Sequence, residues 1–324
     1  MNAAKVIIVG TGGIARCHLG DILKKPRTTK VVGLVEINEA SRVSIRELFV
    51  AEGRETPPFF DSIKEAIKAK TGADSVLIAT PHKFHVDNVC ESLRAGLDVF
   101  VEKPMVLNAV EARRVIRTRD KTGKLVVIGF PGSLSPEIKK AKELVAKGVI
   151  GRLSLISAYV HQEWKESQTG TWRQVPEISG GGFLFDTGSH MINTVVDLLG
   201  DEVAWVKAQF DNCGTPVEIT SSVIGCSKNG IQFSLSAGGD SILCDSGVFL
   251  IGDKGVIETD IWGKRLLIKT VKNPEFTLVP LPKSFSVWEQ FLRVRAGKMA
   301  NPCPPEIGLR FAHLMDLMRK SVDG

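Results

Sequence analysis

The chain has 324 residues, of which 43% are hydrophobic and 24% are charged, and its formal net charge is +6. This composition excludes an intrinsically disordered chain and is typical of a globular protein with about two domains. No apolar run approaches the roughly 20 residues that cross a bilayer. The densest basic cluster, at 113–119, has helical spacing and is expected to be a solvated face. We therefore expect small-molecule partners of anionic character, and neither nucleic acid nor a membrane.

The six cysteines are scattered along the chain, and none forms a C-x-x-C pair. Zinc and redox motifs are therefore unsupported, and we expect no metal site. Single thiols are typical of a reducing compartment. The first residues lead directly into the apolar stretch 6–9, which is shorter than the apolar region of a signal peptide. These features predict a cytoplasmic protein.

Strand and helix patterns alternate over the first 130 residues. We expect strands at 5–9, 30–36, 58–60, 75–79, 99–101 and 125–130, and helices at 14–24, 40–49, 63–69, 84–95 and 109–122. Asp61 and Asn108 lie where helix N-caps are expected. Buried apolar strands that alternate with helices predict an α/β domain over 1–130, a doubly wound parallel sheet of the Rossmann type.

After residue 130 the pattern changes to long β-rich runs. We expect a helix at 136–147, strands at 153–162, 203–210, 217–227, 231–237, 247–250, 255–259 and 265–271, and helices at 286–295 and 307–320. This predicts an α+β domain over 131–324 with a large, mainly antiparallel open sheet, whose last helix packs back on the first domain. Helices cover one sheet face, and the other is a candidate interface for a homodimer or homotetramer.

A glycine-rich turn directly follows the first expected strand. Gly10, Gly12, Gly13 and Ile14 belong to a G-x-G-x-x-A pattern that ends at Ala15. The first glycine permits a tight turn, the second lets backbone N–H groups approach a pyrophosphate, and the helix N-terminus faces the phosphates. With a strand before it and a helix after it, this pattern predicts dinucleotide binding.

The second strand ends at Glu36, 21 residues after Ala15. This is close to the roughly 20 residues expected for a carboxylate that binds the adenosine ribose. Such a carboxylate repels a 2′-phosphate, so NAD is the expected cofactor. NADP remains an alternative, because Arg42 is six residues further on.

A lysine ends the apolar strand 99–101, in the order Glu102-Lys103-Pro104. A charge at the end of a buried parallel strand is costly unless it is used, and this position faces the ligand crevice of an open α/β sheet. We expect Lys103 to lie where the cofactor meets a substrate. The alternative is a lysine that merely leaves the sheet for solvent.

Three glycines at 180–182 precede a helix that contains Asp186 and His190. Residues four apart share one helix face, and a carboxylate beside an imidazole suits proton transfer. The alternative is an N-cap aspartate and a structural histidine. The glycines indicate close backbone approach, either to a ligand or to another element.

The glycine turn, Thr80-Pro81, Glu102-Lys103-Pro104, Trp172-Arg173 and the segment 181–190 occur in an order that resembles the Gfo/Idh/MocA family. This family includes glucose–fructose oxidoreductase and inositol dehydrogenase. The resemblance covers nearly the whole chain. It implies a Rossmann domain, a second domain with an open sheet used in oligomerisation, and pyridine-nucleotide redox chemistry on sugars or cyclitols.

The resemblance also implies roles for particular residues. Lys103, Asp186 and His190 match the catalytic trio. The implied cofactor contacts beyond the glycine turn and Glu36 are Thr80, Pro81, His82, Glu102 and Lys103, and the candidate substrate contacts are Trp172, Arg173, His161 and Asn193. Three positions depart from the family pattern: His82 replaces an asparagine, Ser133 an arginine, and Asn193 an aspartate.

Together these features predict an NAD(P)-dependent dehydrogenase acting on a secondary alcohol of a carbohydrate-like substrate. His190 is the expected general base, Asp186 orients the hydroxyl or the imidazole, and Lys103 stabilises the oxygen as it becomes carbonyl-like. One alternative is an NAD-dependent glycoside hydrolase that oxidises its substrate transiently. Another is a non-catalytic NAD-binding module.

Overall fold

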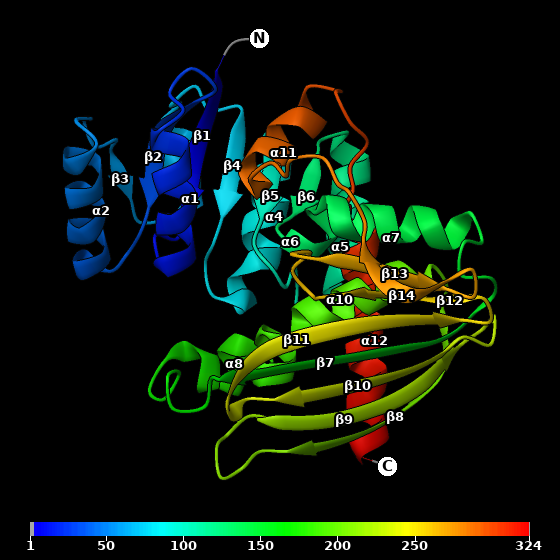
Figure 1. Cartoon of the computed structure of the whole chain (residues 1–324). Helices are drawn as coiled ribbons and strands as arrows, with labels where there is room; N and C mark the ends of the chain where they lie inside the picture. Colours follow the sequence, from blue (N-terminus) through cyan, green and yellow to red (C-terminus); the bar gives the residue numbers. More distant parts are fainter. Residues whose placement is uncertain (1–2, 324) are drawn as a thin grey trace. The chain divides into compact units, whose positions relative to one another are not determined.

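The structure is a computed structural model that describes residues 3–323. Contacts divide the chain into two compact units (Figure 1). The first contains the chain up to residue 106, residues 110–129 and residues 286–305, and the remainder forms the second. Within the described residues, no helix has the length and apolar character needed to cross a membrane.

The first unit is built around a six-stranded parallel sheet in the order β3-β2-β1-β4-β5-β6. The strands are β1 (Ala4–Val9), β2 (Thr29–Val35), β3 (Phe59–Phe60), β4 (Ser75–Ile78), β5 (Asp98–Val101) and β6 (Val126–Ile128). The helices are α1 (Gly13–Leu23), α2 (Glu39–Ala51), α3 (Ile63–Lys68), η1 (His82–Phe84), α4 (His85–Arg94), α5 (Ala109–Thr122) and α11 (Val287–Arg295). β4 and β6 are buried along their whole length, as expected for a parallel sheet covered on both faces. The predicted doubly wound sheet is confirmed.

The strand order reverses direction at β1, which pairs with β2 on one side and β4 on the other. In open α/β sheets, ligands bind outside the carboxyl ends of the strands at such a switch point. The segments 10–13, 79–82 and 102–104 follow β1, β4 and β5, which are neighbours in the sheet. The topology therefore brings these three segments to one sheet edge.

Helix α11 belongs to the first unit although it lies far along the chain. The Trp288 indole N–H donates to Thr29 Oγ1 at 2.9 Å, and the Trp288 and Phe291 rings lie 5.9 and 6.0 Å from the Phe100 ring. Arg295 pairs with Asp98 at 2.8 Å. These aromatic and ionic contacts explain why residues 286–305 group with the parallel sheet.

The second unit contains an eight-stranded sheet in the order β14-β13-β12-β11-β7-β10-β9-β8. Its strands are β7 (Leu153–Glu163), β8 (Val203–Asp211), β9 (Thr220–Ser227), β10 (Gln232–Gly238), β11 (Asp240–Gly252), β12 (Gly255–Thr259), β13 (Leu266–Thr270) and β14 (Asn273–Leu278). The helices are α6 (Pro131–Leu134), α7 (Pro136–Ala146), η2 (Trp172–Gln174), α8 (Pro176–Ser179), α9 (Phe183–Asp186), α10 (Gly188–Leu199) and α12 (Pro305–Asp323). The predicted, mainly antiparallel sheet is confirmed, with one parallel pair between β7 and β10.

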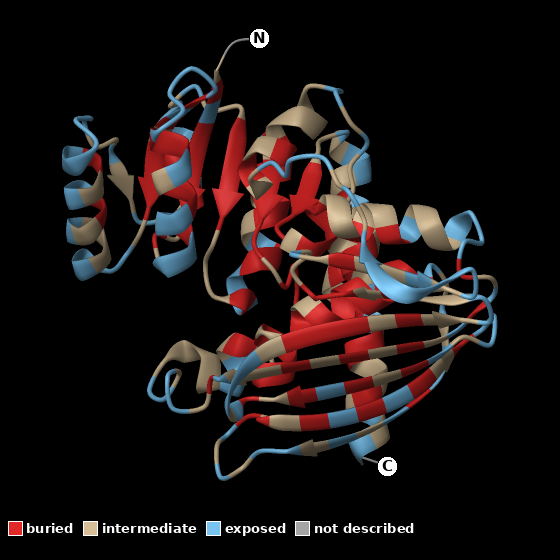
Figure 2. Ribbon diagram, viewed as in Figure 1, coloured by how far each residue is buried: buried red, intermediate tan, exposed pale blue. Residues whose placement is uncertain are grey.

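The two faces of this sheet differ in burial. Along β7, Ile156, Ala158 and Val160 are buried on the face where α10 packs against β7 and β10. Ser157 and Tyr159 alternate with them and lie on the other face, which is only partly covered. The alternation is visible as coloured bands along the strands in Figure 2. The period of two thus produces one core face and one open face.

Several local features differ from the predictions. Strand β14 was not among the expected strands, and every one of its residues is exposed. The helices α6, α8 and α9 have four residues each, which is too short for a helical period. The N-cap of α3 is Ser62, not Asp61: its hydroxyl accepts from Glu65 N–H, while Glu65 accepts from the Asp61 N–H. Ser62 and Glu65 have the Ser-x-x-Glu spacing of a capping box, with the Glu65 carboxylate bonded one residue earlier, at Asp61.

Candidate functional site

The glycine turn leaves open space in front of α1. Gly10 has a φ of +82°, and a Cβ there would lie 2.8 Å from the Ala79 carbonyl oxygen. A Cβ at Gly12 or Gly13 would meet nothing within 4 Å, and no side chain caps α1. The first glycine is therefore required by the fold, and the next two keep the N-terminal N–H groups of α1 accessible to an anion.

The Glu36 carboxylate closes this turn. Its Oε2 accepts from the Thr11 N–H at 2.9 Å and from the Thr11 hydroxyl at 2.8 Å. Its Oε1 accepts from the N–H groups of Ile37 and Asn38, both at 2.9 Å. The end of β2 is thereby fixed to the turn after β1.

Arg42, the cation that could bind a 2′-phosphate of NADP, contacts Glu36 and Asp61. Its Nε donates to the Glu36 carbonyl oxygen at 2.7 Å, and its Nη2 lies 2.5 Å from Asp61 Oδ1. The guanidinium also lies over the Phe59 ring, 5.4 Å from its centroid. These contacts hold Arg42 against β3.

His85 links the segments that follow β4 and β5. Its Nε2 lies 2.8 Å from the Thr80 carbonyl oxygen, and its Nδ1 lies 2.9 Å from the Pro104 carbonyl oxygen. The ring is fully buried and lies 5.8 Å from the buried ring of His82. The imidazole at the start of α4 thus contacts both the segment after β4 and the segment after β5, each of which contains predicted cofactor contacts.

Glu102 and Lys103 are held from the other side by α1. His18 Nε2 lies 2.6 Å from Glu102 Oε1, and each side chain is only 8% exposed. The other carboxylate oxygen accepts from the Lys103 N–H at 3.1 Å. The Lys103–Pro104 peptide bond is cis. The backbone that carries the Lys103 amine is therefore anchored to the helix that follows the glycine turn.

In the second unit, Asp186 is buried at the end of α9 and accepts two side-chain hydrogen bonds. The Trp164 indole N–H and the Arg173 Nε each donate to Oδ2 at 3.0 Å. The Arg173 guanidinium lies 4.6 Å from the centroid of the Trp172 ring. The structure thus brings Trp172 and Arg173 together with Asp186, and it adds Trp164, which the sequence patterns did not single out.

His190 lies in the first turn of α10, between aromatic side chains. Its ring centroid is 5.9 Å from that of Phe130 and 6.3 Å from that of Trp262. Its N–H donates to the Thr187 carbonyl oxygen at 3.1 Å. The imidazole is therefore flanked by two aromatic rings, one helical turn beyond Asp186.

Asn193 belongs to a buried polar chain on α10. Its amide donates to the Ser133 hydroxyl at 2.7 Å, which donates to Asp197 Oδ2 at 3.2 Å. Lys142 Nζ lies 2.5 Å from the other Asp197 oxygen. Two of the three positions that depart from the family pattern, 133 and 193, are thus in direct contact with each other.

His161 lies apart from this group. It follows Tyr159 by two residues on β7, and the two rings stack at 5.6 Å on the open face of the sheet. Asp186 and α10 belong to the opposite face. Lys103 lies in the first unit, and its convergence with Asp186 and His190 on one substrate stays a prediction.

The glycines at 180–182 lie against another part of the chain. A Cβ at Gly182 would clash with the Glu218 carbonyl oxygen, and a Cβ at Gly181 would lie 3.1 Å from Glu218 Oε1. The structure therefore supports close approach of these glycines to another part of the chain, at Glu218, rather than to a ligand.

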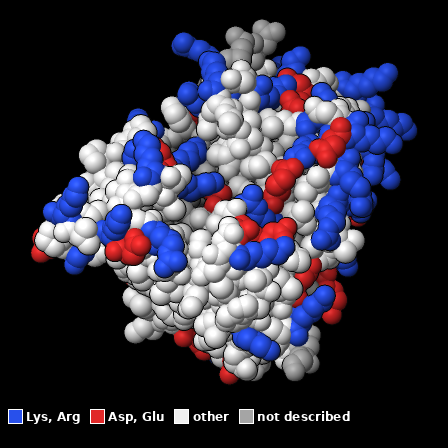
Figure 3. Space-filling view, turned by 90° about the vertical axis from the view of Figure 1, so that its right-hand side faces the viewer, with Lys and Arg blue, Asp and Glu red and all other residues white. Residues whose placement is uncertain are grey.

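Basic side chains gather along one side of the face drawn in Figure 3, with acidic side chains among them. In the cluster at 113–119, Arg114 Nη2 lies 2.8 Å from Asp87 Oδ1, and Arg119 Nη2 lies 2.7 Å from Asp120 Oδ1. These exposed pairs are consistent with a solvated helix face.

Across residues 3–323, no three His, Cys, Asp or Glu side chains are grouped to hold a metal ion.

Two family models match the chain. One described as "Oxidoreductase family, NAD-binding Rossmann fold" matches residues 4–130, and one described as "GFO/IDH/MocA C-terminal domain" matches residues 138–258. The two matches agree with the resemblance that the motifs carry.

Relatives match over most of the chain. It is 24% identical to Oxidoreductase P35 of Formosa agariphila over 96% of both proteins, and 24% identical to inositol 2-dehydrogenase of Salmonella paratyphi B over 87% of this chain and 81% of that protein. The solved structure of the WlbA dehydrogenase from Bordetella pertussis, in complex with NADH and UDP-GlcNAcA, is similar with a TM-score of 0.83 at 18% identity, over 99% of this chain and 97% of that chain. This likeness shows a shared fold.

The His18–Glu102 pair generates a stability prediction. The substitution His18→Leu removes the donor from a buried carboxylate, so we expect the free energy of unfolding to fall by about 3 kcal/mol. Urea denaturation measures the change. The matched control is His313→Leu, because His313 is an exposed helical histidine. Equal losses in the two variants would contradict a special role for the pair.

His85 generates a pH prediction. Burial lowers the pKa of His85 below 6.5, although hydrogen bonds to the Pro104 and Thr80 carbonyls oppose this shift. The two carbonyl contacts favour the charged ring, because a neutral ring donates through only one nitrogen, but complete burial of the side chain penalises the charge more strongly. As the pH falls below 6.5, the unfolded chain therefore binds a proton before the folded one does, and stability declines.

The measurement is the urea midpoint of the wild type and of His85→Gln between pH 8 and pH 5. We expect the wild-type midpoint to decrease more steeply over this range than that of the variant. Parallel curves would show that His85 has the same pKa in both states.

Proposed function

The chain belongs to the Gfo/Idh/MocA oxidoreductase family, and we propose that it transfers a hydride between nicotinamide and a secondary alcohol of a sugar, a cyclitol or a sugar derivative. One observation carries the proposal. The glycine turn, Thr80-Pro81 and Lys103 follow three neighbouring parallel strands, so they share the sheet edge where such folds bind ligands. A relative named inositol 2-dehydrogenase and a structural neighbour crystallised with NADH and UDP-GlcNAcA support a polyhydroxylated substrate.

The residues at this edge fit NAD. The open space at Gly12 and Gly13 accommodates a pyrophosphate at the N-terminus of α1. A carboxylate has about four lone-pair positions, and in Glu36 all are occupied by backbone and Thr11 donors. A ribose hydroxyl therefore replaces one donor, and the Thr11 hydroxyl can rotate away. Because Arg42 is held by Asp61, NAD is favoured over NADP.

The bound nicotinamide supplies a hydride acceptor or donor. The chain's own groups manage the substrate oxygen and its proton. His190 takes the hydroxyl proton at a ring nitrogen, and Asp186, oriented by Trp164 and Arg173, fixes the hydroxyl or the imidazole. The Lys103 amine donates a hydrogen bond to the oxygen as negative charge develops there.

Substrate contacts are proposed around Asp186 and on α10. Arg173 reaches Asp186 with its Nε, which leaves the outer nitrogens of its guanidinium for substrate hydroxyls. Trp172 stacks under the guanidinium and offers an apolar face of the kind that packs against a sugar ring. Asn193 lies one turn beyond His190 and completes the proposed set.

The deciding experiment is a panel of aldoses, cyclitols and amino sugars, incubated with NAD or NADP and followed by NADH or NADPH absorbance. The proposed function predicts stoichiometric NADH formation with at least one member and a higher kcat/KM with NAD. Glycoside cleavage without net NADH would instead indicate the transient-oxidation alternative. NAD binding without turnover of any member would contradict the enzyme proposal.

The role of Lys103 generates a kinetic prediction. In Lys103→Ala, kcat falls by about 10²- to 10³-fold, because a donor to the developing charge is lost. The Kd for NAD changes little, since the glycine turn and Glu36 are intact. Stopped-flow kinetics and calorimetry measure the two constants. Lys83→Ala is the control, because Lys83 is exposed in η1; an unchanged kcat in Lys103→Ala would remove the amine from the mechanism.

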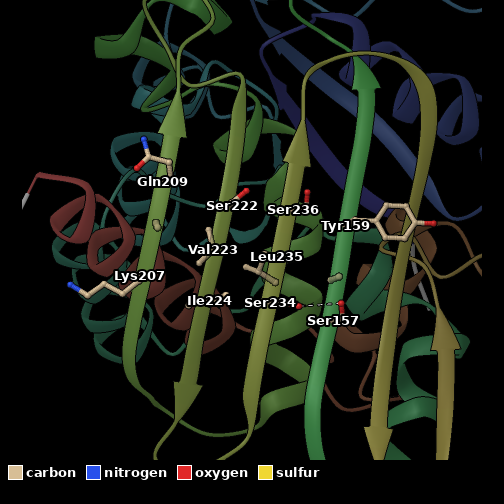
Figure 4. Close-up of a pocket in the computed structure, with 12 residues that line it drawn as sticks. Ser157, Tyr159, Lys207, Gln209, Ser222, Val223, Ile224, Ser234, Leu235 and Ser236 are labelled. Atoms are coloured by element: carbon tan, nitrogen blue, oxygen red, sulfur yellow. Dashed lines mark hydrogen bonds between the residues drawn. The ribbon is translucent and has the colours of Figure 1, made fainter.

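The open face of the second unit supports self-association. It contains a hollow of about 530 Å³ whose lining includes the side chains of Ser157, Ser222, Ser234, Ser236 and Ile224 (Figure 4). Small side chains make this face flat, and Ile224 and Trp205 are each about half exposed on it. A flat, partly apolar face of β-strands suits the same face of a second copy, related by a twofold axis. We propose a homodimer or homotetramer through this sheet.

The substitution Ser234→Arg tests this interface. Ser234 lies in the middle of β10 and donates to Ser157 at 3.1 Å, so a long cation there blocks close sheet packing. We expect the wild type to have a multiple of the 35.2 kDa chain mass in light scattering, and the variant to have a lower mass. Asn229→Arg, in the exposed β9–β10 turn, is the control. A wild type of single-chain mass would contradict the interface.

The free thiols support a proposal on cellular location. All six cysteines are free, and Cys17 and Cys244 are exposed. Exposed free thiols persist in a reducing environment. We propose that the protein acts in the cytoplasm.

A further inference from the structure

The α9 turn that presents Asp186 is held by two charged residues from distant parts of the second unit. Glu218 precedes β9, and Arg319 lies near the end of α12. Neither belongs to the motifs that identify the family in this chain. Their contacts converge on the glycine run 180–182 and on α9.

Glu218 caps the start of α9 twice. Its carbonyl oxygen accepts from the Phe183 N–H at 2.8 Å, and its Oε1 accepts from the Phe185 N–H at 3.2 Å. A four-residue helix has little stability of its own, because its N–H groups lack intrahelical partners. The α9 turn therefore depends on these acceptors.

Arg319 holds the other end of the glycine run. Its Nη1 donates to the Leu107 carbonyl oxygen at 3.2 Å, and its Nη2 donates to the Gly180 carbonyl oxygen. The guanidinium lies 5.0 Å from the centroid of the Phe185 ring, within α9. The attraction between its charge and Glu218 partly offsets the burial of both groups.

The position of Asp186 follows from these anchors. The Asp186 N–H donates to the carbonyl oxygen of Gly182 at 2.9 Å, and Gly182 directly precedes Phe183, whose N–H is held by Glu218. On the other side, Trp164 and Arg173 fix the carboxylate oxygen Oδ2. A shift of Gly182 or Phe185 would change the backbone of Asp186 while its side-chain donors stay in place.

We propose that Glu218 and Arg319 are positioning residues for catalysis, which act through the glycine run and α9 on the orientation of the Asp186 carboxylate. The inference rests on the proposed function of Asp186. A displacement of about 1 Å can lower a rate by about 10²-fold. A small displacement of the α9 turn that carries Asp186 therefore has a measurable effect on kcat. Gly182 is required because only a residue without Cβ lets the Glu218 backbone approach this closely, and a Cβ at Gly181 would lie 2.6 Å from the Phe185 Cβ.

The kinetic experiment compares four variants of the full-length protein with the best substrate from the panel. Arg319→Lys keeps the charge but loses the fork that reaches two carbonyls, and Glu218→Ala removes the carboxylate acceptor. We expect each to lower kcat by about 10-fold to 100-fold with little change in the KM for NAD. Glu218→Gln retains an acceptor for the Phe185 N–H and is expected to recover most of the activity lost in Glu218→Ala. Glu275→Ala, an exposed glutamate on β14, is the control.

A double-mutant cycle distinguishes positioning from general loss of structure. If Glu218 acts through Asp186, adding Glu218→Ala to Asp186→Asn lowers kcat no further. Additive losses would overturn the proposal. If Glu218→Ala does not fold, the same cycle with Arg319→Lys decides.

A spectroscopic readout separates this inference from the proposed function. The Trp164 indole N–H donates to Asp186, so its ¹H–¹⁵N resonance, assigned through Trp164→Phe, reports on the carboxylate without any turnover. We expect it to shift in Arg319→Lys and in Glu218→Ala but not in Glu275→Ala. An unshifted resonance would overturn the positioning role. Full activity in Asp186→Asn would overturn the proposed function of Asp186, and the catalytic part of this inference with it, even if the resonance shifts.

Discussion

A parallel sheet directs the carboxyl ends of all its strands to one edge, and the candidate cofactor site of the first unit depends on this constraint. The apolar strands cannot accept charge along their length, so polar groups gather where they end. Glu36 and Glu102 are such groups, and both are satisfied by donors from the turn after β1 or the helix that follows it. The edge is thus a set of linked segments rather than independent loops.

In the second unit, side chains stabilise a buried carboxylate. Asp186 is buried on a short helix, where a bare carboxylate would be costly. Trp164 from the end of β7 and Arg173 from η2 supply the donors, and Glu218 and Arg319 fix the backbone. In both units, buried carboxylates are paired with donors from other elements, so each site is defined only when the tertiary structure is complete.

The sequence predicted what depends on local pattern. Alternating apolar strands and helices gave the parallel sheet, and the G-x-G-x-x-A turn was recognisable from spacing because each glycine has its own steric requirement. The partners of the predicted residues were not predictable. His18 lies 84 residues from Glu102, and Glu218 lies 33 residues from Phe185, so nothing in their neighbourhoods indicates these contacts. The N-cap of α3 is a different case, because the Ser-x-x-Glu pattern at 62–65 is local and could have been recognised, whereas Asp61 was chosen by residue type alone.

The position of His161 could not be predicted for a different reason. Its strand was predicted, but which face of the sheet it occupies is set by the residues that α10 covers, and this requires knowledge of the packing. The parallel pairing of β7 with β10 has the same origin, because the paired residues are 77 positions apart in the sequence and no turn fixes the direction of the strands.

Because α11 belongs to the first unit, this unit cannot be exchanged between related proteins by a single cut in the chain. The chain passes between the two units at 106/107, 109/110, 129/130, 285/286 and 305/306. A fragment cut at residue 130 would lack the rings of Trp288 and Phe291 against Phe100, and the Arg295 partner of Asp98. Residues 1–130 alone are therefore not a complete first unit. An exchange of this unit between relatives preserves its contacts only if residues 286–305 are exchanged as well.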